Sequence, residues 1–265
     1  QRTMDQIWAF GDARGRGFLL GATAGRTTLN GEGLQHEDGH SHLLASAVPS
    51  CVAYDPAFAY EVATIVKDGL RRMYEQGEYL LYYVTLYNLY YAQPARPDAA
   101  TDEAILRGLY LYRPAPARAK LRANLFASGP LVLQALRAQE MLSEKWGVAA
   151  DVWSATSPQQ LRNEALEVER WNRLHPTQKP RVPYVTRALA KADGPVVATS
   201  DWMKGVNDLA ARWVPNRFVA LGTDVYGRSD TREALRRHFE IDAEHLAVAT
   251  LHALAVDVEG LATRP

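Results

Sequence analysis

Histidines and acids gather in one short, glycine-punctuated stretch of this 265-residue chain. Residues 31–42 read GEGLQHEDGHSH, and their ionisable members are His36, His40, His42, Glu32, Glu37 and Asp38. Because the unperturbed pKa of histidine lies nearest neutrality, such side chains can give and take protons at physiological pH. Glycine permits backbone conformations that other residues resist. We therefore interpret this stretch as a loop suited to proton transfer at a bound ligand.

Two other interpretations of this histidine loop remain open. Surface loops are polar, so the cluster can be a solvated turn. A metal site is the other alternative, in which His40 and His42 share a face and His36 supplies a third ligand. Gly39 weakens this second interpretation, because metal-ligand spacing is usually met on regular elements.

Composition excludes several classes of protein. Lys plus Arg and Asp plus Glu both number 30, so the net charge is zero and gives no general reason to bind nucleic acid or an anionic membrane. The longest apolar stretch, 79–92, is shorter than a bilayer span, and no signal peptide opens the chain. The single cysteine, Cys51, has apolar neighbours and is predicted to be a buried structural thiol. We expect a soluble cytoplasmic protein, and the non-methionine start suggests a piece of a longer one.

Strand and helix patterns alternate along the chain. Strands are expected at 18–21, 48–54, 78–86, 121–127, 148–153, 196–199 and 218–223. Helices are expected after Asp55-Pro56, at 102–107, 128–146, after Ser157, and at 206–213, 232–239 and 243–255. The alternation predicts an α/β fold with mostly parallel sheets covered on both faces. A Pro- and Ala-containing linker at 113–118 predicts two domains, 1–113 and 114–265.

The histidine loop follows the strand at 18–21, and ligands of parallel sheets gather beyond the carboxyl ends of strands. The chain has no Gly-x-Gly-x-x-Gly motif after a strand, no Walker loop and no Gly-x-Ser-x-Gly elbow. Nucleotide binding and serine hydrolysis therefore lose most of their support. Trp171 and His175, just before Pro176, are expected to pack a loop rather than meet a ligand.

Several motifs together resemble one enzyme family. They are GRTTLN at 25–30 running into the histidine loop, and the segments 11–19, 54–61, 151–157, 169–176 and 221–232. In this order they resemble the homodimeric pyruvate dehydrogenase E1 component, a thiamine-diphosphate enzyme of the transketolase superfamily. The resemblance implies two three-layer α/β units of transketolase-like fold. Residues 1–113 would form the later part of the pyrimidine-binding middle domain, and 114–265 the C-terminal domain.

The resemblance also implies an activity and its partners. Members of the family decarboxylate pyruvate on thiamine diphosphate with Mg²⁺ and transfer the acetyl group to a lipoyl-bearing E2 acetyltransferase, working as a dimer of E1 subunits. The family's magnesium and diphosphate motif and its catalytic glutamate lie upstream of Gln1, so the cofactor-binding residues are unknown. The chain alone is therefore expected to be inactive. The alternative is that the isolated chain is a non-catalytic binding or assembly module of the complex.

The resemblance assigns roles within the histidine loop. His36 matches an active-site histidine that would orient substrate and transfer protons during acyl transfer, and His42 falls where related enzymes place a second one. His40 and Asp38 complete the expected catalytic set, in which Asp38 and Glu37 would orient the imidazoles. One departure is Asn88, which stands where relatives carry an acid.

Overall fold

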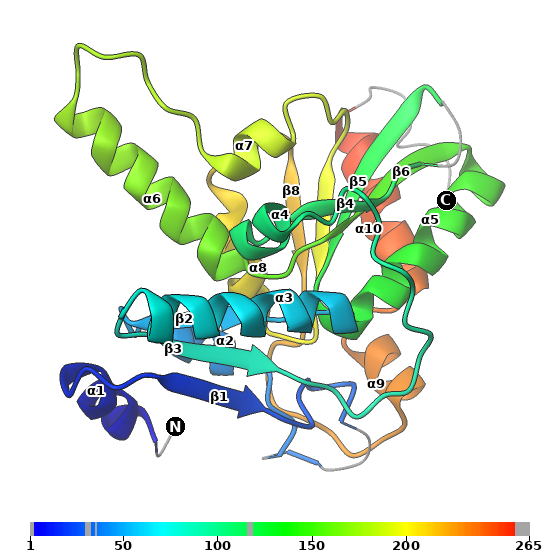
Figure 1. Cartoon of the computed structure of the whole chain (residues 1–265). Coiled ribbons are helices and arrows are strands. Elements are labelled where there is room, and N and C mark those ends of the chain that lie inside the picture. Colours follow the sequence, from blue (N-terminus) through cyan, green and yellow to red (C-terminus); the bar gives the residue numbers. More distant parts are fainter. Residues whose placement is uncertain (1–2, 30–32, 35, 116–118, 258–265) are drawn as a thin grey trace.

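Two sheets organise the chain, each lying between layers of helices (Figure 1). The computed structural model describes residues 3–29, 33–34, 36–115 and 119–257. Residues 30–32 and 35 of the motif region, and 116–118 of the expected linker, lie outside this description. Within it, no helix is long and apolar enough to cross a membrane.

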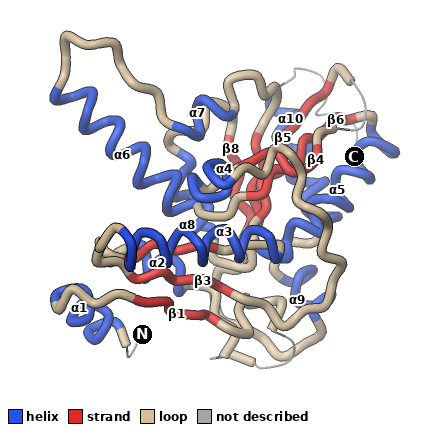
Figure 2. The backbone as a smooth tube through the Cα atoms, viewed as in Figure 1, coloured by secondary structure: helices blue, strands red, loops and turns tan. Residues whose placement is uncertain are grey.

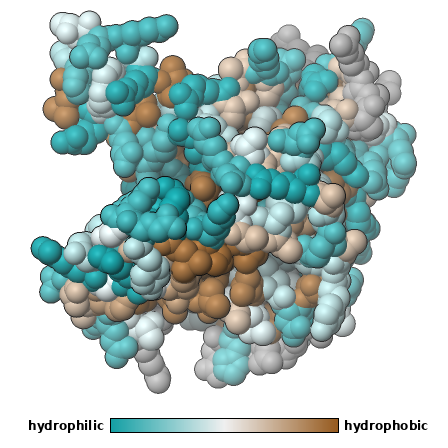
Figure 3. Space-filling model, in the orientation of Figure 1, coloured by the Kyte–Doolittle hydropathy of each residue, from teal (hydrophilic) through white to brown (hydrophobic). Residues whose placement is uncertain are grey.

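The first sheet has three parallel strands in the order β1-β3-β2. They are β1 (Gly17–Gly21), β2 (Cys51–Tyr54) and β3 (Leu81–Thr85). One face packs against α3 (Ala59–Leu70), its π-helical extension (Arg71–Glu75) and α4 (Asp102–Arg107). The other face packs against α1 (Met4–Asp12) and α2 (Ser41–Ser46). β1 is an edge strand with partly exposed Leu19 and Leu20, and Figure 3 shows a hydrophobic area around β3, beneath α3.

The second sheet has five strands in the order β4-β6-β5-β7-β8 (Figure 2). They are β4 (Tyr110–Arg113), β5 (Leu121–Ala127), β6 (Val148–Ser154), β7 (Val196–Thr199) and β8 (Phe218–Leu221). Only β4 is antiparallel, and it lies at the edge. One face carries α5 (Val132–Trp146), which follows a 3-10 turn (Gly129–Leu131), and α10 (Ala243–Asp257). The other carries α6 (Pro158–Leu174), α7 (Tyr184–Ala188) and α8 (Lys204–Ala211).

These two layered units confirm the predicted α/β class with mostly parallel sheets. Local signals set several helix ends as expected. The Ser157 hydroxyl accepts the Gln160 N–H at 3.0 Å at the start of α6, and Gly147 ends α5 with φ +64°. The α9 helix (Arg232–His238) lies near the carboxyl ends of the first sheet's strands (Figure 1).

The predicted start of α3 is wrong. The Asp55-Pro56 pair predicts a helix with Asp55 as its N-cap and Pro56 as its first residue, but the helix begins at Ala59 after Phe58. The Glu61 carboxylate caps it instead, accepting the Phe58 N–H at 3.0 Å. Tertiary contacts override the local signal here, because the Asp55 carboxylate is engaged elsewhere in a buried network described below.

Sequence patterns missed α1, α2, β4 and α7. Each is short, and β4 is an edge strand followed by proline, a placement that edges tolerate. β4 ends at Arg113 and pairs with β6 of the five-stranded sheet. The domain boundary between residues 113 and 114 stays a prediction.

Candidate active site

A hollow of about 400 Å³ opens at the carboxyl end of the three-stranded sheet. Its walls come from the end of β1, the segment that follows it, the histidine loop and the segment after β3. The lining residues include Gly21, Ala24, His36, Asp38, Tyr83 and Asn88. This is the edge at which parallel sheets bind ligands. Two of the four predicted catalytic side chains, His36 and Asp38, therefore line one concavity.

His36 lies in an exposed turn at this hollow. Asn88, the residue that replaces an acid of the relatives, lines the same hollow from the segment after β3. An imidazole at the rim of a concave site can reach a bound ligand and exchange protons with it at neutral pH. The His36 side chain therefore lies where it would contact a ligand held in the hollow.

Asp38 fixes the start of α2 and approaches His40. Its Oδ1 accepts the backbone N–H groups of His40 at 2.9 Å and Ser41 at 3.1 Å. The same oxygen lies 3.5 Å from His40 Nδ1. A carboxylate at a helix N-terminus satisfies otherwise unpaired N–H groups. Asp38 thus anchors the segment between the hollow and α2 and contacts the imidazole of His40.

His42 is buried behind the hollow rather than among its lining residues. Its side chain, in the first turn of α2, is 4% exposed, and Nε2 lies 3.2 Å from the Thr85 hydroxyl. The ring packs against Tyr83 and, edge to face at 4.5 Å, against Trp202. Burial lowers the pKa of His42 to about 4, so the imidazole is neutral at pH 7.

Thr85 connects His42 to a buried carboxylate that sequence reasoning did not identify. The Thr85 hydroxyl donates to Asp55 Oδ1 at 2.6 Å, and the Trp202 indole N–H donates to Asp55 Oδ2 at 2.8 Å. Tyr87 also donates its hydroxyl to Asp55. Asp55 is 2% exposed, and burial raises its pKa to about 6. A signal was present, since an acid directly after a buried strand stands at the ligand-binding edge of a sheet.

A second buried carboxylate, Asp201, holds the segment that precedes the histidine loop. Its Oδ1 accepts the Thr27 N–H at 2.9 Å, and Thr28 donates its hydroxyl to Oδ2. Gly25 has φ +89°, and a Cβ there would lie 2.5 Å from Asp201 Oδ2. Only glycine accepts both this positive φ and this close approach to the carboxylate. The GRTT part of the motif is therefore built to cross closely over the exit of β7.

Arg26 ties the histidine loop to the exit of β8. Its guanidinium, on a residue only 6% exposed, donates from Nε to the Glu37 carbonyl at 3.1 Å. Nη1 donates to the carbonyls of Thr223 and Val225. Burial lowers the pKa of Arg26, and neighbouring acids led by Asp38 counter that shift. One guanidinium thus fixes the backbone just after His36.

Glu37 points away from the hollow, toward the segment between β8 and α9. It is buried, and its Oε2 accepts the Arg228 N–H at 2.6 Å. Burial raises the pKa of Glu37. Two arginines of α9 bind the segment that precedes the histidine loop. Arg232 donates to the Thr28 carbonyl at 2.7 Å, and Arg236 donates to the Thr28 hydroxyl at 3.2 Å. Among the described residues, Glu37 makes no hydrogen bond or ion pair with an imidazole, so its expected role in orienting imidazoles stays a prediction.

Among the described residues, no group of three His, Cys, Asp or Glu side chains could hold a metal ion. Cys51 is buried, as expected, and burial raises the pKa of its thiol to about 12. The thiolate is therefore scarce at neutral pH, which agrees with the predicted structural role of Cys51.

Comparisons with known proteins agree with the geometry. Residues 1–94 match the family model of the pyruvate dehydrogenase E1 component middle domain. Residues 108–242 match the transketolase-like C-terminal domain. The chain is 54% identical over 260 residues to the pyruvate dehydrogenase E1 component of Mycolicibacterium smegmatis, covering 98% of this chain and 28% of that protein. It is 48% identical over 257 residues to the Escherichia coli K12 protein of the same name, covering 96% and 28%.

Solved structures show the same fold at low identity. Transketolase from Leishmania mexicana superposes with a TM-score of 0.67 at 17% identity, covering 98% of this chain and 33% of that one. This likeness establishes the fold alone. The chain spans little more than a quarter of the length of the curated relatives it matches.

Proposed function

Because this chain belongs to the pyruvate dehydrogenase E1 family of transketolase-like proteins, we propose that it forms part of an enzyme that decarboxylates pyruvate and transfers the acetyl group to lipoyl-E2. Residues 1–113 supply the later part of the pyrimidine-binding domain, and residues 114–265 the C-terminal domain. The hollow that His36 and Asp38 line is the observation that supports this assignment most directly.

The cofactor proposed for the parent enzyme is thiamine diphosphate with Mg²⁺. When bound, it would supply the carbanion and the electron sink that decarboxylation of a 2-oxo acid requires. The hollow at the sheet edge, whose lining includes the polar side chains of His36, Asp38 and Asn88, would face the reacting end of such a cofactor and its substrate. The described residues contain no cluster that would hold the metal at the diphosphate end. We therefore assign that end to polypeptide outside this chain.

His36 is the proposed proton-transfer residue. It lines the hollow on an exposed turn, where its imidazole can orient a carbonyl substrate and move a proton during acyl transfer. Asp38 and His40 act beside it, since Asp38 anchors the loop and contacts the His40 ring. His42 is proposed to position the wall of the site through Thr85 and Tyr83, because its burial keeps it neutral and away from the lining.

Three further proposals concern the partners and location of the enzyme. A second E1 subunit completes a homodimer, the lipoyl-bearing E2 acetyltransferase accepts the acetyl group, and the protein works in the cytoplasm. The bacterial origin of the relatives supports this location. The competing proposal is that the isolated chain acts as a non-catalytic binding or assembly module of the complex. An upstream sequence with a diphosphate motif and a catalytic glutamate favours the enzyme.

Carbon dioxide release from pyruvate tests whether the 265-residue chain needs the rest of the parent protein for activity. The 265-residue chain is to be compared with the parent protein, both supplied with thiamine diphosphate and Mg²⁺. We expect turnover by the parent and none by the chain, because the metal-binding end of the site is missing from it. Turnover by the chain alone would contradict the proposal.

A further inference from the structure

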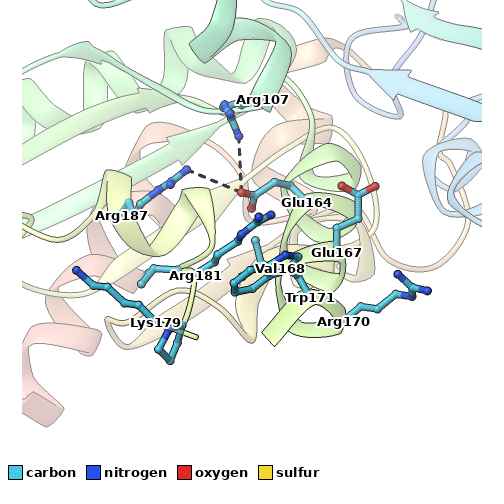
Figure 4. A pocket seen from close by; sticks show the side chains of 11 residues that line it. Arg107, Glu164, Glu167, Val168, Arg170, Trp171, Lys179, Arg181 and Arg187 are labelled. Carbon is cyan, nitrogen blue, oxygen red and sulfur yellow. Dashed lines mark ion pairs between the residues drawn. The ribbon is translucent and has the colours of Figure 1, made fainter. Parts of the chain in front are cut away.

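A second and larger hollow lies beside α6 and α7, two of the helices that cover the five-stranded sheet. The carboxyl half of α6 extends beyond the body of the molecule, and residues 175–183 return from its tip toward α7 (Figure 1). Between them is a hollow of about 980 Å³, seen in close-up in Figure 4. Figure 3 shows mainly hydrophilic residues on this projection. None of these elements belongs to the hollow that His36 lines.

The lining of this second hollow carries an excess of positive charge. Its basic side chains are Arg107, Arg170, Lys179, Arg181 and Arg187, and its acids are Glu164 and Glu167. The whole chain has equal numbers of acidic and basic residues, so this local excess is not a property of the average surface. An anion would therefore be attracted to it.

Two of the guanidinium groups converge on one carboxylate without saturating their donors. Glu164 Oε1 lies 3.6 Å from Arg107 Nη1 and 3.8 Å from Arg187 Nη2 (Figure 4). Both distances exceed hydrogen-bond length. The other oxygen of Glu164 accepts the Tyr184 N–H at 2.8 Å, which holds the carboxylate in place. Arg107 also donates from Nε to Glu103 at 2.8 Å, so the terminal N–H groups of Arg107 and Arg187 are the donors left for a further acceptor.

The opposite wall of the hollow is held in a fixed arrangement. Arg181 lies with its Cζ 3.8 Å from the Trp171 ring centroid, and His175 stacks on the same indole at 4.4 Å. The side-chain amide of Asn172 hydrogen-bonds both the N–H and the carbonyl of Arg181, at 2.8 and 2.9 Å. A stacked guanidinium keeps its in-plane N–H donors free. Arg181 is thus pre-organised to donate to a ligand.

We propose that this hollow binds a small anion that carries phosphate groups. Guanidinium forks match the spacing of phosphate oxygens, and a volume of about 980 Å³ lies within the range of small-molecule sites. Convergence of Arg107 and Arg187 on one point suits a compact, multiply charged anion, whereas an extended acidic peptide would be met by charges spread along a surface. The site goes beyond the proposed acetyl-transfer function and does not depend on it.

Calorimetric titration of the 265-residue chain with inorganic tripolyphosphate tests this site. Arg187→Gln removes one converging fork and is expected to weaken binding about tenfold, the size of one charge-assisted hydrogen bond. Arg137→Gln is the matched control, because Arg137 is an exposed arginine paired with Glu244 outside the hollow. Equal weakening by both substitutions would show diffuse charge attraction and would overturn the proposal. So would an absence of binding to the unsubstituted chain at millimolar tripolyphosphate.

The carboxylate at the centre of the hollow provides an independent test. Glu164→Gln removes the charge that competes for Arg107 and Arg187 while leaving an oxygen for the Tyr184 N–H. We expect it to tighten tripolyphosphate binding, and we expect less effect from Glu167→Gln, which changes an exposed acid of the same lining. Weaker binding by Glu164→Gln, or binding of poly-glutamate but not of tripolyphosphate, would refute a small-phosphate site.

Discussion

Trp202 donates its indole N–H to the carboxylate of Asp55 across 2.8 Å, although 147 positions separate the two residues. Asp55 follows β2 of the first sheet, and Trp202 follows β7 of the second. The same indole packs edge to face on the ring of His42. The wall behind the histidine loop is therefore shared by both sheets, and the loop's geometry depends on both.

Asp55→Asn should destabilise the chain by about 2–3 kcal/mol. The carboxylate accepts from Thr85, Tyr87 and Trp202, so an amide nitrogen placed there would face a buried donor. Urea unfolding of the 265-residue chain measures this loss. Asp98→Asn, at an exposed position, is the control and should change stability little. Equal stability of the two variants would mean that the Asp55 network does not hold the sheets together.

His42 should make the chain sensitive to acid. Its folded pKa is about 4 and its ordinary value is 6.5, so between these pH values the unfolded chain binds a proton that the folded chain does not. Falling pH therefore lowers the free energy of unfolding, by up to about 3 kcal/mol. His42→Gln should flatten this dependence between pH 6.5 and 4, whereas exposed His252→Gln should not. An unchanged slope in His42→Gln would show that His42 titrates normally.

The titration of Asp55 has the opposite effect on the free energy of unfolding over nearly the same pH range. Its folded pKa is raised from 3.8 to about 6, so its contribution is present at low pH and is lost as the pH rises through 6. Part of the His42 effect is thereby masked in the unsubstituted chain. The pH profile of Asp55→Asn should accordingly fall more steeply toward acid than that of the unsubstituted chain.

Arg26→Met should loosen the histidine loop. The substitution leaves the carbonyls of Glu37, Thr223 and Val225 without their donor. Amide hydrogen exchange in residues 36–40 should accelerate by about tenfold or more, since a tenfold change corresponds to about 1.4 kcal/mol, the size of one lost contact. Arg26→Lys should rescue only part of the protection, because an ammonium lacks the planar fork.

A surface arginine provides the control for that measurement. Arg71 is half exposed and pairs with Asp68 on α3. Arg71→Met should leave exchange in residues 36–40 unchanged. Equal acceleration by the two substitutions would mean that Arg26 does not specifically position the loop.

Local sequence patterns predicted most of the fold because the interactions that start and end its helices and strands are local. The alternation of strand and helix, the glycine after α5 and the serine before α6 each act through neighbouring backbone groups. The same patterns misplaced the start of α3, because the carboxylate of Asp55 is more strongly engaged by Thr85 and Trp202 than by a helix end. That competition involves residues far apart in the chain, and a local pattern does not contain it.

The location of the candidate site could be predicted from the sequence, but the hydrogen bonds and packing contacts that build it could not. The position of the histidine loop after a parallel strand indicated the carboxyl edge, where His36 and Asp38 now line a hollow. The burial of His42 could not be read from a stretch that looked uniformly polar, since it follows from Tyr83 and Trp202 packing on the ring. The anchoring by Arg26 depends on carbonyls after β8, nearly 200 residues away.

Acetyl transfer by the parent enzyme carrying His36→Ala tests the central claim most directly. His36 is exposed at the hollow, so its removal should leave the free energy of unfolding unchanged. Transfer of acetyl groups from pyruvate to a lipoyl domain should fall on the order of a hundredfold, the contribution of a positioned acid–base group. His252→Ala, on the surface of α10, should transfer at the unsubstituted rate. An unchanged rate in His36→Ala would contradict the account.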